Sequence, residues 1–266
     1  MTIEDERRAH MNQAEIISEL TARIDRGEEK YKYGERLPST RDLAQEFEST
    51  QQTVSSAFSV MAGMGLVSVR RGSGATVIAG KPGRIKLGTY RSANREIATS
   101  ATAWKRDHGN GAKEGPTQIN HLVITEADAD TGIEVGAEVV ERIRTRFDGD
   151  GAPCQHKRTL VTAEAATLTP EGWTGLPPMM RAGDVKPPKG LTISKWLGMG
   201  VVLVTYDMCV SMAAGPAAEA LTLPEGTPTL RIVSRGMRDD GSVAFATVTT
   251  APMRSTVSLE IQESDI

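Results

Sequence analysis

Residues 37 to 44, Leu-Pro-Ser-Thr-Arg-Asp-Leu-Ala, constrain the fold of this chain more than any other stretch. The proline fixes an extended entry, and Ser39 can cap a helix whose third residue is Asp42, which is the spacing of a capping box. A second short helix is predicted from about Thr50, and a glycine-turned hairpin is predicted around residues 72–74. Helix, turn, helix and β-wing in this order predict a winged helix-turn-helix, which places a helix in the major groove of DNA.

The spacing of apolar residues predicts three short helices that share one small core. None of the three is long enough to be stable alone, so they must pack together. Residues 66–69 and 75–78 are predicted to be the two strands of the wing. The residues predicted to be apolar contacts are Ile16, Ile17, Leu20 and Ile24 in the first helix, Leu43, Ala44 and Phe47 in the second, and Val54, Ala57, Phe58 and Met61 in the third.

Polar residues left out of this core define a predicted DNA-binding surface. A glutamine amide can pair with adenine, a serine hydroxyl can donate or accept, and arginines can hold phosphates. An ordinary solvated surface is the alternative for any single one of these positions. The predicted DNA-binding residues are Ser39, Thr40, Arg41, Thr50, Gln51, Gln52, Thr53, Ser55, Arg70, Arg71, Gly72, Ser73 and Gly74.

Composition sets broad bounds on the rest of the chain. Its 266 residues suffice for two domains, and its net charge of −3 argues only weakly against nucleic acid, because a local basic patch can exist in an acidic chain. The first residues are charged and unlike a signal peptide, and no stretch is apolar enough to span a membrane, so we expect a cytoplasmic protein. The two cysteines, Cys154 and Cys209, lack the spacing of a zinc site or a disulfide framework.

The N-terminal pattern resembles the winged-helix domain of the GntR family of bacterial transcription regulators. Where that family usually has arginine in the recognition helix, this chain has Gln51 and Ser55, so the resemblance implies the fold but not the operator sequence. The resemblance covers residues 14–77 and consists of Gly-x-x-Leu-Pro-Ser from Gly34, Arg-x-Leu-Ala from Arg41, Thr53-Val54, Gly65-Leu66-Val67 and the Gly-x-Gly wing.

A polar and basic segment follows the wing. Between Lys81 and Lys113 the basic residues far outnumber the acidic ones, and Trp104 is the largest apolar side chain. Residues 80–116 are therefore predicted to be a basic linker, which either serves as a solvated connector or adds phosphate contacts.

The C-terminal part contains an internal repeat. Residues 127–152 align without a gap with residues 217–242, at an offset of 90 positions, so that Gly136 matches Gly226 and Asp150-Gly151 matches Asp240-Gly241. Each copy predicts a short helix, a glycine turn, and two strands joined by an Asp-Gly hairpin. Two such copies around a pseudo-twofold axis predict a single antiparallel sheet with helices on one side.

One strand of the first copy carries three arginines on the same face. Arg142, Arg144 and Arg146 alternate with Ile143 and Thr145, so their side chains point the same way. A wet outer face is one explanation, and a pocket for a small anion held by bidentate contacts is the other. Arg235 is the corresponding basic residue of the second copy, although strand alternation alone does not settle which side faces inward.

This layout resembles the UTRA effector domain, which is related in fold to chorismate lyase and follows GntR-type winged helices in the HutC subfamily. The resemblance covers roughly residues 120–261. It implies that Arg144 and Arg146 help to bind an effector, while Lys157 stands where a carboxylate is often found. It implies an α+β fold with a winged helix-turn-helix followed by a chorismate-lyase-like antiparallel-sheet domain.

A stretch rich in Pro, Gly and Met separates the two copies of the repeat. Residues 168–199 predict a long loop and a short helix that starts near Thr192, where free backbone amides could bind an anion. The loop is either a lid over a pocket or a variable surface insert.

These patterns together predict a transcription regulator with three parts: a DNA-binding domain over 1–79, the linker over 80–116, and an effector-binding and dimerisation domain over 117–266. The expected partners are palindromic operator DNA, a second copy of the chain and a small anionic or polar effector held by Arg144, Arg146, Thr192 and Arg235. No cofactor, metal or membrane is expected, and a repressor is favoured. Two alternatives are a ligand-blind dimeric autoregulator, for example of a mobile element, and a lyase-like enzyme, which the absence of catalytic motifs disfavours.

Overall fold

The computed structural model describes residues 10–70, 72, 74–87, 104–105, 108–183, 185–188 and 190–259. The chain forms two compact units. The first holds the chain up to Pro82 together with Asp150–Pro153 and Met212–Pro228, and the second holds the remainder.

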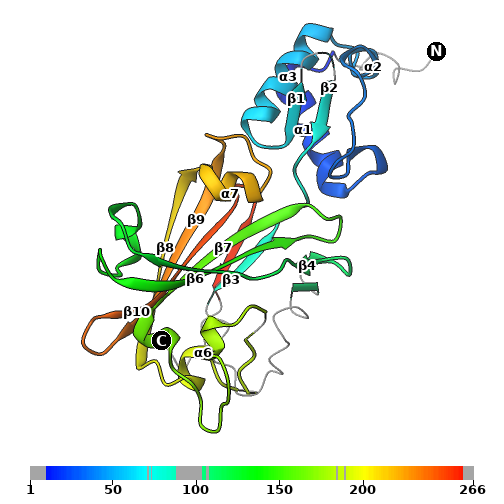
Figure 1. Ribbon diagram of the computed structural model, residues 1–266. Coiled ribbons are helices and arrows are strands. Elements are labelled where there is room, and N and C mark those ends of the chain that lie inside the picture. Colours follow the sequence, from blue (N-terminus) through cyan, green and yellow to red (C-terminus); the bar gives the residue numbers. More distant parts are fainter. Residues whose placement is uncertain are drawn as a thin grey trace, which may run out of the picture. The chain divides into compact units, whose positions relative to one another are not determined.

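A winged helix-turn-helix makes up most of the first unit (Figure 1). Its elements are α1 (Gln13–Arg26), the 3-10 helix η2 (Glu29–Tyr31), α2 (Thr40–Glu46), α3 (Gln51–Gly63), and the wing strands β1 (Val67–Arg70) and β2 (Gly74–Val77). The wing is antiparallel, with Val67 opposite Val77. The predicted helices are confirmed, and each wing strand differs from its predicted range by one residue.

The core of this unit is the one that periodicity predicts. All the apolar contacts predicted for the three helices are buried, except that Ile17 is only partly buried. Outside the winged helix, α7 (Gly215–Ala220) also belongs to this unit, and the apolar cluster around Leu221 and Leu223 packs against Ile78.

Side-chain caps fix where the helices begin. Ser39 accepts a hydrogen bond from the backbone N–H of Asp42, but the carboxylate of Asp42 accepts from the Ser39 hydroxyl rather than from its backbone, so the predicted capping box is only half formed. A complete capping box occurs at α1 instead, between Asn12 and Glu15. Thr50 caps α3, where its hydroxyl accepts from the N–H of Thr53.

The second unit is built on an antiparallel sheet of seven strands among the described residues (Figure 1). The strands run in the order β4 (Lys113–Glu114), β6 (Glu138–Phe147), β7 (Pro153–Thr162), β10 (Val243–Pro252), β9 (Pro228–Arg238) and β8 (Val201–Met212), and β5 (Gln118–Val123) also pairs with β6. The predicted α+β class, with a winged helix-turn-helix before an antiparallel sheet, is confirmed.

The internal repeat is visible in the sheet. The 3-10 helix η3 (Glu126–Thr131), β6 and β7 recur as α7, β9 and β10, and the two copies meet where β7 pairs with β10. The matched glycines adopt matched left-handed conformations, with φ of 92° at Gly136 and 79° at Gly226. The sheet is therefore pseudo-symmetric about the β7–β10 seam.

Part of the segment predicted to be a linker forms strands of the second unit. Strand β3 (Arg84–Leu87) pairs in parallel with β11 (Thr256–Leu259), and β4 pairs with β6. Trp104 is buried and donates a hydrogen bond from its indole to the carbonyl of Phe147. These pairings are long-range, so composition alone did not reveal them.

Short helical segments lie on both faces of the sheet, which corrects the prediction of helices on one side. On one face, η3 lies over Arg158 and Arg235, which contact Asp128 and Asp130 respectively. The other face carries α5 (Ala163–Ala166), η4 (Pro178–Met180) and α6 (Ile193–Trp196), whose apolar residues pack against the alternate side chains of β6 and β7. The predicted helix start at Thr192 is confirmed, because Thr192 caps α6.

Candidate nucleic-acid interface and a polar cluster in the sheet

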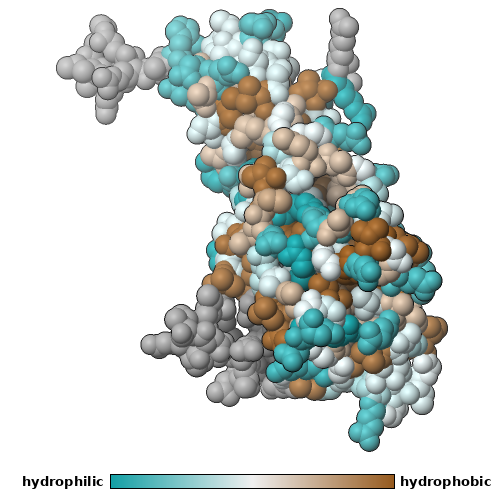
Figure 2. Space-filling model, turned by 90° about the vertical axis from the view of Figure 1, so that its left-hand side faces the viewer, coloured by the Kyte–Doolittle hydropathy of each residue, from teal (hydrophilic) through white to brown (hydrophobic). Residues whose placement is uncertain are grey.

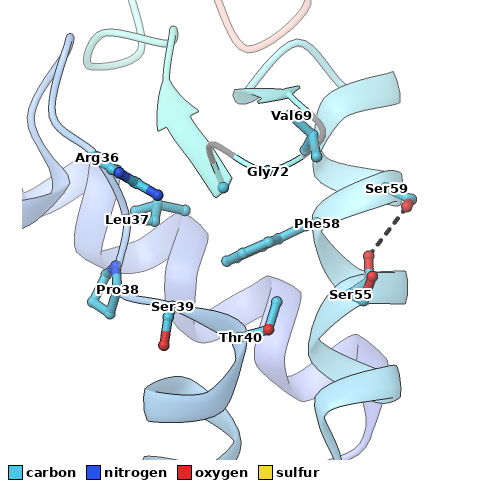
Figure 3. A pocket seen from close by; sticks show the side chains of 11 residues that line it. Arg36, Leu37, Pro38, Ser39, Thr40, Ser55, Phe58, Ser59, Val69 and Gly72 are labelled. Carbon is cyan, nitrogen blue, oxygen red and sulfur yellow. Dashed lines mark hydrogen bonds between the residues drawn. The ribbon is translucent and has the colours of Figure 1, made fainter.

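A hollow of about 510 Å³ lies between the wing, the start of α2 and α3 (Figure 3). The ring of Phe58 points into it from α3, toward the loop that carries Leu37. The residues that line the hollow are Arg36, Leu37, Pro38, Ser39, Thr40, Ser55, Phe58, Ser59, Val69, Gly72 and Gly74.

The structure brings several predicted DNA-binding residues together around this hollow. Five of its lining residues, from three separate segments, were selected from the sequence: Ser39, Thr40, Ser55, Gly72 and Gly74.

The remaining predicted DNA-binding residues lie on the same helices and wing or outside the described residues. Thr53 is half-buried, and its hydroxyl is hydrogen-bonded to that of Thr50. Arg71 and Ser73 lie outside the described residues. The side chains of Arg41, Thr50, Gln51, Gln52 and Arg70 are exposed.

Arg36 is a candidate that the sequence analysis missed. It forms an isolated antiparallel bridge with Thr76 of the wing, and its guanidinium lies beside Gly74, where it would be 3.4 Å from an added Cβ. Its side chain is exposed. The sequence did place Arg36 directly before the Leu-Pro-Ser motif, which could have marked it as a DNA-binding candidate. Only the pairing with β2 shows that Arg36 borders the hollow.

Three arginines on this surface form no ion pair with the described part of the chain: Arg36, Arg41 and Arg70. Arg23, on α1, contrasts with them, because it bonds to Glu19, Glu46 and Tyr31. Exposed guanidinium groups without an internal carboxylate are available for phosphate oxygens. These three guanidinium groups supply positive charge to this surface, although the whole chain carries −3.

A second polar cluster lies on one face of the sheet in the second unit. Arg144 and Arg146 of β6 both form ion pairs with Glu114, at 2.9 and 2.5 Å, and their side chains are only 17% and 18% exposed. Arg144 also donates to Thr117, and Arg146 donates to Gln155 at 2.8 Å. The two predicted effector arginines are therefore neighbours, and they are held by a carboxylate from the segment that was predicted to be a linker.

Lys157 adds a third cation to this cluster. It lies on β7, two residues from Gln155 and opposite Thr249 of β10. Burial, together with the nearby charges of Arg146 and Arg144, lowers the pKa of Lys157 from its ordinary value of 10.5 to about 8, against the opposing effect of Glu114. Within the described residues this cluster, which we call the cationic cluster, has three basic side chains and one carboxylate.

The other predicted effector residues lie elsewhere. Arg235 is on the opposite face of the sheet, where it bonds to Asp207 and to the backbone carbonyl of Asp130. The hydroxyl of Thr192 accepts from the N–H of Lys195 as a helix cap. The structure brings neither residue to the cationic cluster, because strand alternation sends Arg235 to the other face.

Arg142, the third arginine of the predicted row, has a structural partner set. It is buried, and it donates to the backbone carbonyls of Met179, Arg181 and Gly183. It therefore fixes the middle of the long 168–199 segment to the sheet.

The described residues limit other kinds of site. No helix in the described part of the chain is long and apolar enough to cross a membrane. Among the same residues, no group of three or more His, Cys, Asp or Glu side chains could hold a metal ion. Cys154 is buried, which raises the pKa of its thiol to about 12. Cys209 is exposed, and the two cysteines form no disulfide with each other.

The fold and the surface define the class of the protein: a winged helix-turn-helix DNA-binding module joined to an antiparallel-sheet domain. Residues 12–77 match the family model described as "Bacterial regulatory proteins, gntR family". Over these residues the N-terminal domain of this chain is similar to that family of DNA-binding regulators.

Solved structures that the chain is similar to include PhnF from Mycobacterium smegmatis, at 19% identity and a TM-score of 0.47, over 93% of this chain and 99% of that one. A possible transcriptional regulator, YydK, from Bacillus subtilis has 18% identity and a TM-score of 0.42, over 93% and 99% of the two chains. The effector domain of PhnF matches 67% of this chain and 99% of its own, at 16% identity and a TM-score of 0.44. No curated protein matches the chain.

Proposed function

We propose that the protein is a sequence-specific transcription regulator, a repressor in its ligand-free state, that binds a palindromic operator as a homodimer. The observation that carries the proposal is the gntR-family domain, whose exposed polar residues surround one hollow. One winged helix reads a short half-site, and a twofold-symmetric pair reads two matched half-sites with higher affinity.

Base reading is assigned to the first turn of α3, and backbone contact to the flanking arginines. Gln51 and Gln52 are exposed at the N-terminus of that helix, where a recognition helix meets base edges. Arg36, Arg41 and Arg70 supply positive charge beside it. The predicted role of Arg71 and Ser73 in the wing stays a prediction.

Selection of DNA from a random library, followed by sequencing, tests this proposal. We expect the purified full chain to enrich an inverted repeat. Enrichment of a non-repeated site, or of no sequence at all, would contradict the palindromic reading.

We further propose that the cationic cluster binds a small anionic effector. Among the described residues, three basic groups around one carboxylate leave an excess of positive charge, and burial makes this excess costly. An anion bridging Arg144, Arg146 and Lys157 would offset this cost through charge-assisted hydrogen bonds. Bound anion would then favour one arrangement of the two DNA-binding domains in the dimer.

A ligand-blind regulator is the second candidate, and one observation favours it. Glu114 already engages both Arg144 and Arg146, so the two guanidinium groups have an internal partner. In this case the sheet domain would serve only dimerisation.

A thermal-shift series separates the two candidates. The probes are inorganic phosphate, a phosphonate and a tricarboxylate, each at constant ionic strength, since a ligand of the native state raises its melting temperature. If the cationic cluster is an effector site, the probe should raise the melting temperature of wild type but not that of Lys157→Met. The control is Lys195→Met, which changes a lysine of α6 and should keep the rise in melting temperature. No shift in any of the three proteins would favour the ligand-blind regulator, whereas an equal rise in all three would place anion binding outside the cationic cluster.

A further inference from the structure

Strand β8 is a long and exposed edge of the sheet. It has 12 residues, and in the described chain it is the last strand on its side, next to β9. Eight of its 12 residues are exposed and the other four are partly buried; Val202 is 62% exposed, Val210 61% and Met212 61%. Figure 2 looks onto the side of the molecule where β8 lies in Figure 1, and it shows brown apolar surface there among teal patches.

Most apolar side chains of β8 lie on one face, although Leu203 on the other face is 54% exposed. Alternate residues of a strand point to the same side, and on β8 every even-numbered residue is apolar or aromatic. Tyr206 of this set packs toward Ile85, Leu87 and Ile232, which identifies the face as the one covered by β3 and β11. The even-numbered set is Val202, Val204, Tyr206, Met208, Val210 and Met212.

This edge lacks the features that keep exposed strands from pairing. Natural edges carry lysines, prolines, bulges or inward-pointing charges. Strand β8 contains no lysine, arginine or proline, and its single charge, Asp207, is engaged by Arg235 of the same chain at 2.6 Å. An edge of this length and composition needs a partner that covers it.

The opposite edge of the sheet is different. Strand β5 reads Gln-Ile-Asn-His-Leu-Val and is half the length of β8. Polar residues such as Asn120 and His121 are exposed along it. Val123 at the end of β5 is also exposed, so what distinguishes β8 is the length of its exposed apolar edge.

We propose that β8 pairs in antiparallel fashion with β8 of a second copy of this chain, across a twofold axis perpendicular to the sheet. The inference rests on the dimer of the proposed function and assigns its surface. Such an axis keeps each face on its own side, so even-numbered residues meet even-numbered residues. When Tyr206 lies opposite its own copy, Val204 meets Met208 and Val202 meets Val210.

Self-pairing of β8 would give its backbone groups hydrogen-bond partners and would bury its apolar side chains. The edge N–H and C=O groups gain partners, and two apolar stripes become one. No like charges are forced together, because Asp207 already has an internal cation. The palindromic operator of the proposed function requires the same twofold symmetry, which favours a second copy over an unrelated polypeptide.

Light scattering and sedimentation of the full chain test the assignment. We expect wild type to be a dimer and the double variant Val204→Lys, Met208→Lys to be a monomer, with a dimer dissociation constant raised about a hundredfold or more, because four lysines would be removed from water in each dimer. The matched control is Val123→Lys, Val135→Lys, which changes two apolar residues of the same unit that are 50% and 44% exposed, away from β8. The control should remain a dimer, and circular dichroism should show all three proteins folded.

A distance measurement avoids substitution altogether. Cys209 is exposed on β8 while Cys154 is buried, so a nitroxide reagent labels one site per chain. With the axis near Tyr206 or Asp207, the two labels should lie about 15–25 Å apart, given about 3.3 Å per residue and the length of the label. A distance beyond about 40 Å would place the dimer contact elsewhere.

The outcomes separate this inference from the function on which it rests. A monomeric wild type, a double variant that stays dimeric, or distant labels each overturn the β8 assignment. Binding to a random-sequence duplex at low salt is measured in parallel on wild type. A β8-paired dimer that binds no DNA would overturn the proposed function and support the interface.

Discussion

Lys157 is the residue whose environment departs most from what its sequence position suggests. As a lysine on a strand it would ordinarily reach water, but it is half-buried beside two arginines. Its pKa of about 8 lies below the 10.5 of an unfolded chain, so between these values the unfolded state binds more protons than the folded state.

Lys157→Met should therefore stabilise the free protein, most strongly below pH 8. Stability of wild type rises with pH wherever the unfolded state binds more protons, so the difference between variant and wild type should shrink from about pH 8 to about pH 10.5. Urea unfolding at a series of pH values measures it. A difference that is constant over this range would show that Lys157 titrates normally.

Gln51 offers a test of base reading by one side chain. Gln51→Ala should cost about 1–3 kcal/mol on the selected operator and less on a random duplex. Gln45→Ala is the control, because Gln45 is an exposed glutamine of α2 outside the predicted set. Equal losses on both kinds of DNA would rule out a base contact.

The roles of single residues could be predicted from the sequence where their partners lie close by along the chain. The buried residues of α1, α2 and α3 followed from helical spacing, and Thr50 and Thr192 were recognised near helix starts. Glu114 was missed as the partner of Arg144 and Arg146, because the pairing of β4 with β6 brings it there over some 30 positions of sequence.

Strands β9 and β10 show how a single glycine allows two elements to pair closely. An added Cβ on Gly236 would be 2.3 Å from Cε1 of Phe245, so the aromatic ring lies directly over the glycine. The ladder between these strands is irregular between Val243 and Phe245.

Gly236→Ala should destabilise the protein by about 1–3 kcal/mol, as overpacking does. Gly63→Ala is the control, because nothing lies within 4 Å of its Cβ position, and it should leave stability nearly unchanged. Thermal and urea unfolding measure both. If Phe245→Leu restores the stability of Gly236→Ala, the ring contact is the cause; failure of this rescue would point to the backbone instead.

Helices and strands were predicted best where the sequence shows a clear periodicity or repeat. The repeat predicted β6, β7, β9 and β10 and their Asp-Gly turns, since each half contains its own hairpin signal. Strand β3 was missed, because its partner β11 lies at the far end of the chain and neither is long enough to show a period.

For the whole molecule, the salt dependence of DNA affinity reports both the local charge and the number of chains that bind. The chain carries −3 overall, so DNA binding must depend on a few local cations and should weaken steeply with salt. Each phosphate contact contributes close to one unit to the slope of log K against log salt concentration.

Arg41→Ala should therefore reduce the magnitude of that slope by about two units when a dimer binds one operator, and by about one unit when a monomer binds. Fluorescence anisotropy across a salt series gives the slope. An unchanged slope would show that Arg41 makes no phosphate contact, whatever the oligomeric state.

The pseudo-symmetry of the sheet has a consequence for how far such a protein can assemble. At the offset of the repeat, β5 corresponds to the end of β8, so the two outer strands occupy equivalent positions in the two copies. Two equally adhesive edges would let copies add without end and grow into a fibre. Here β8 is long and apolar while β5 is short and more polar, so joining through β8 would cover the one long apolar edge that this sheet has among the described strands. If β8 pairs as proposed, the difference between the two edges limits growth to two chains.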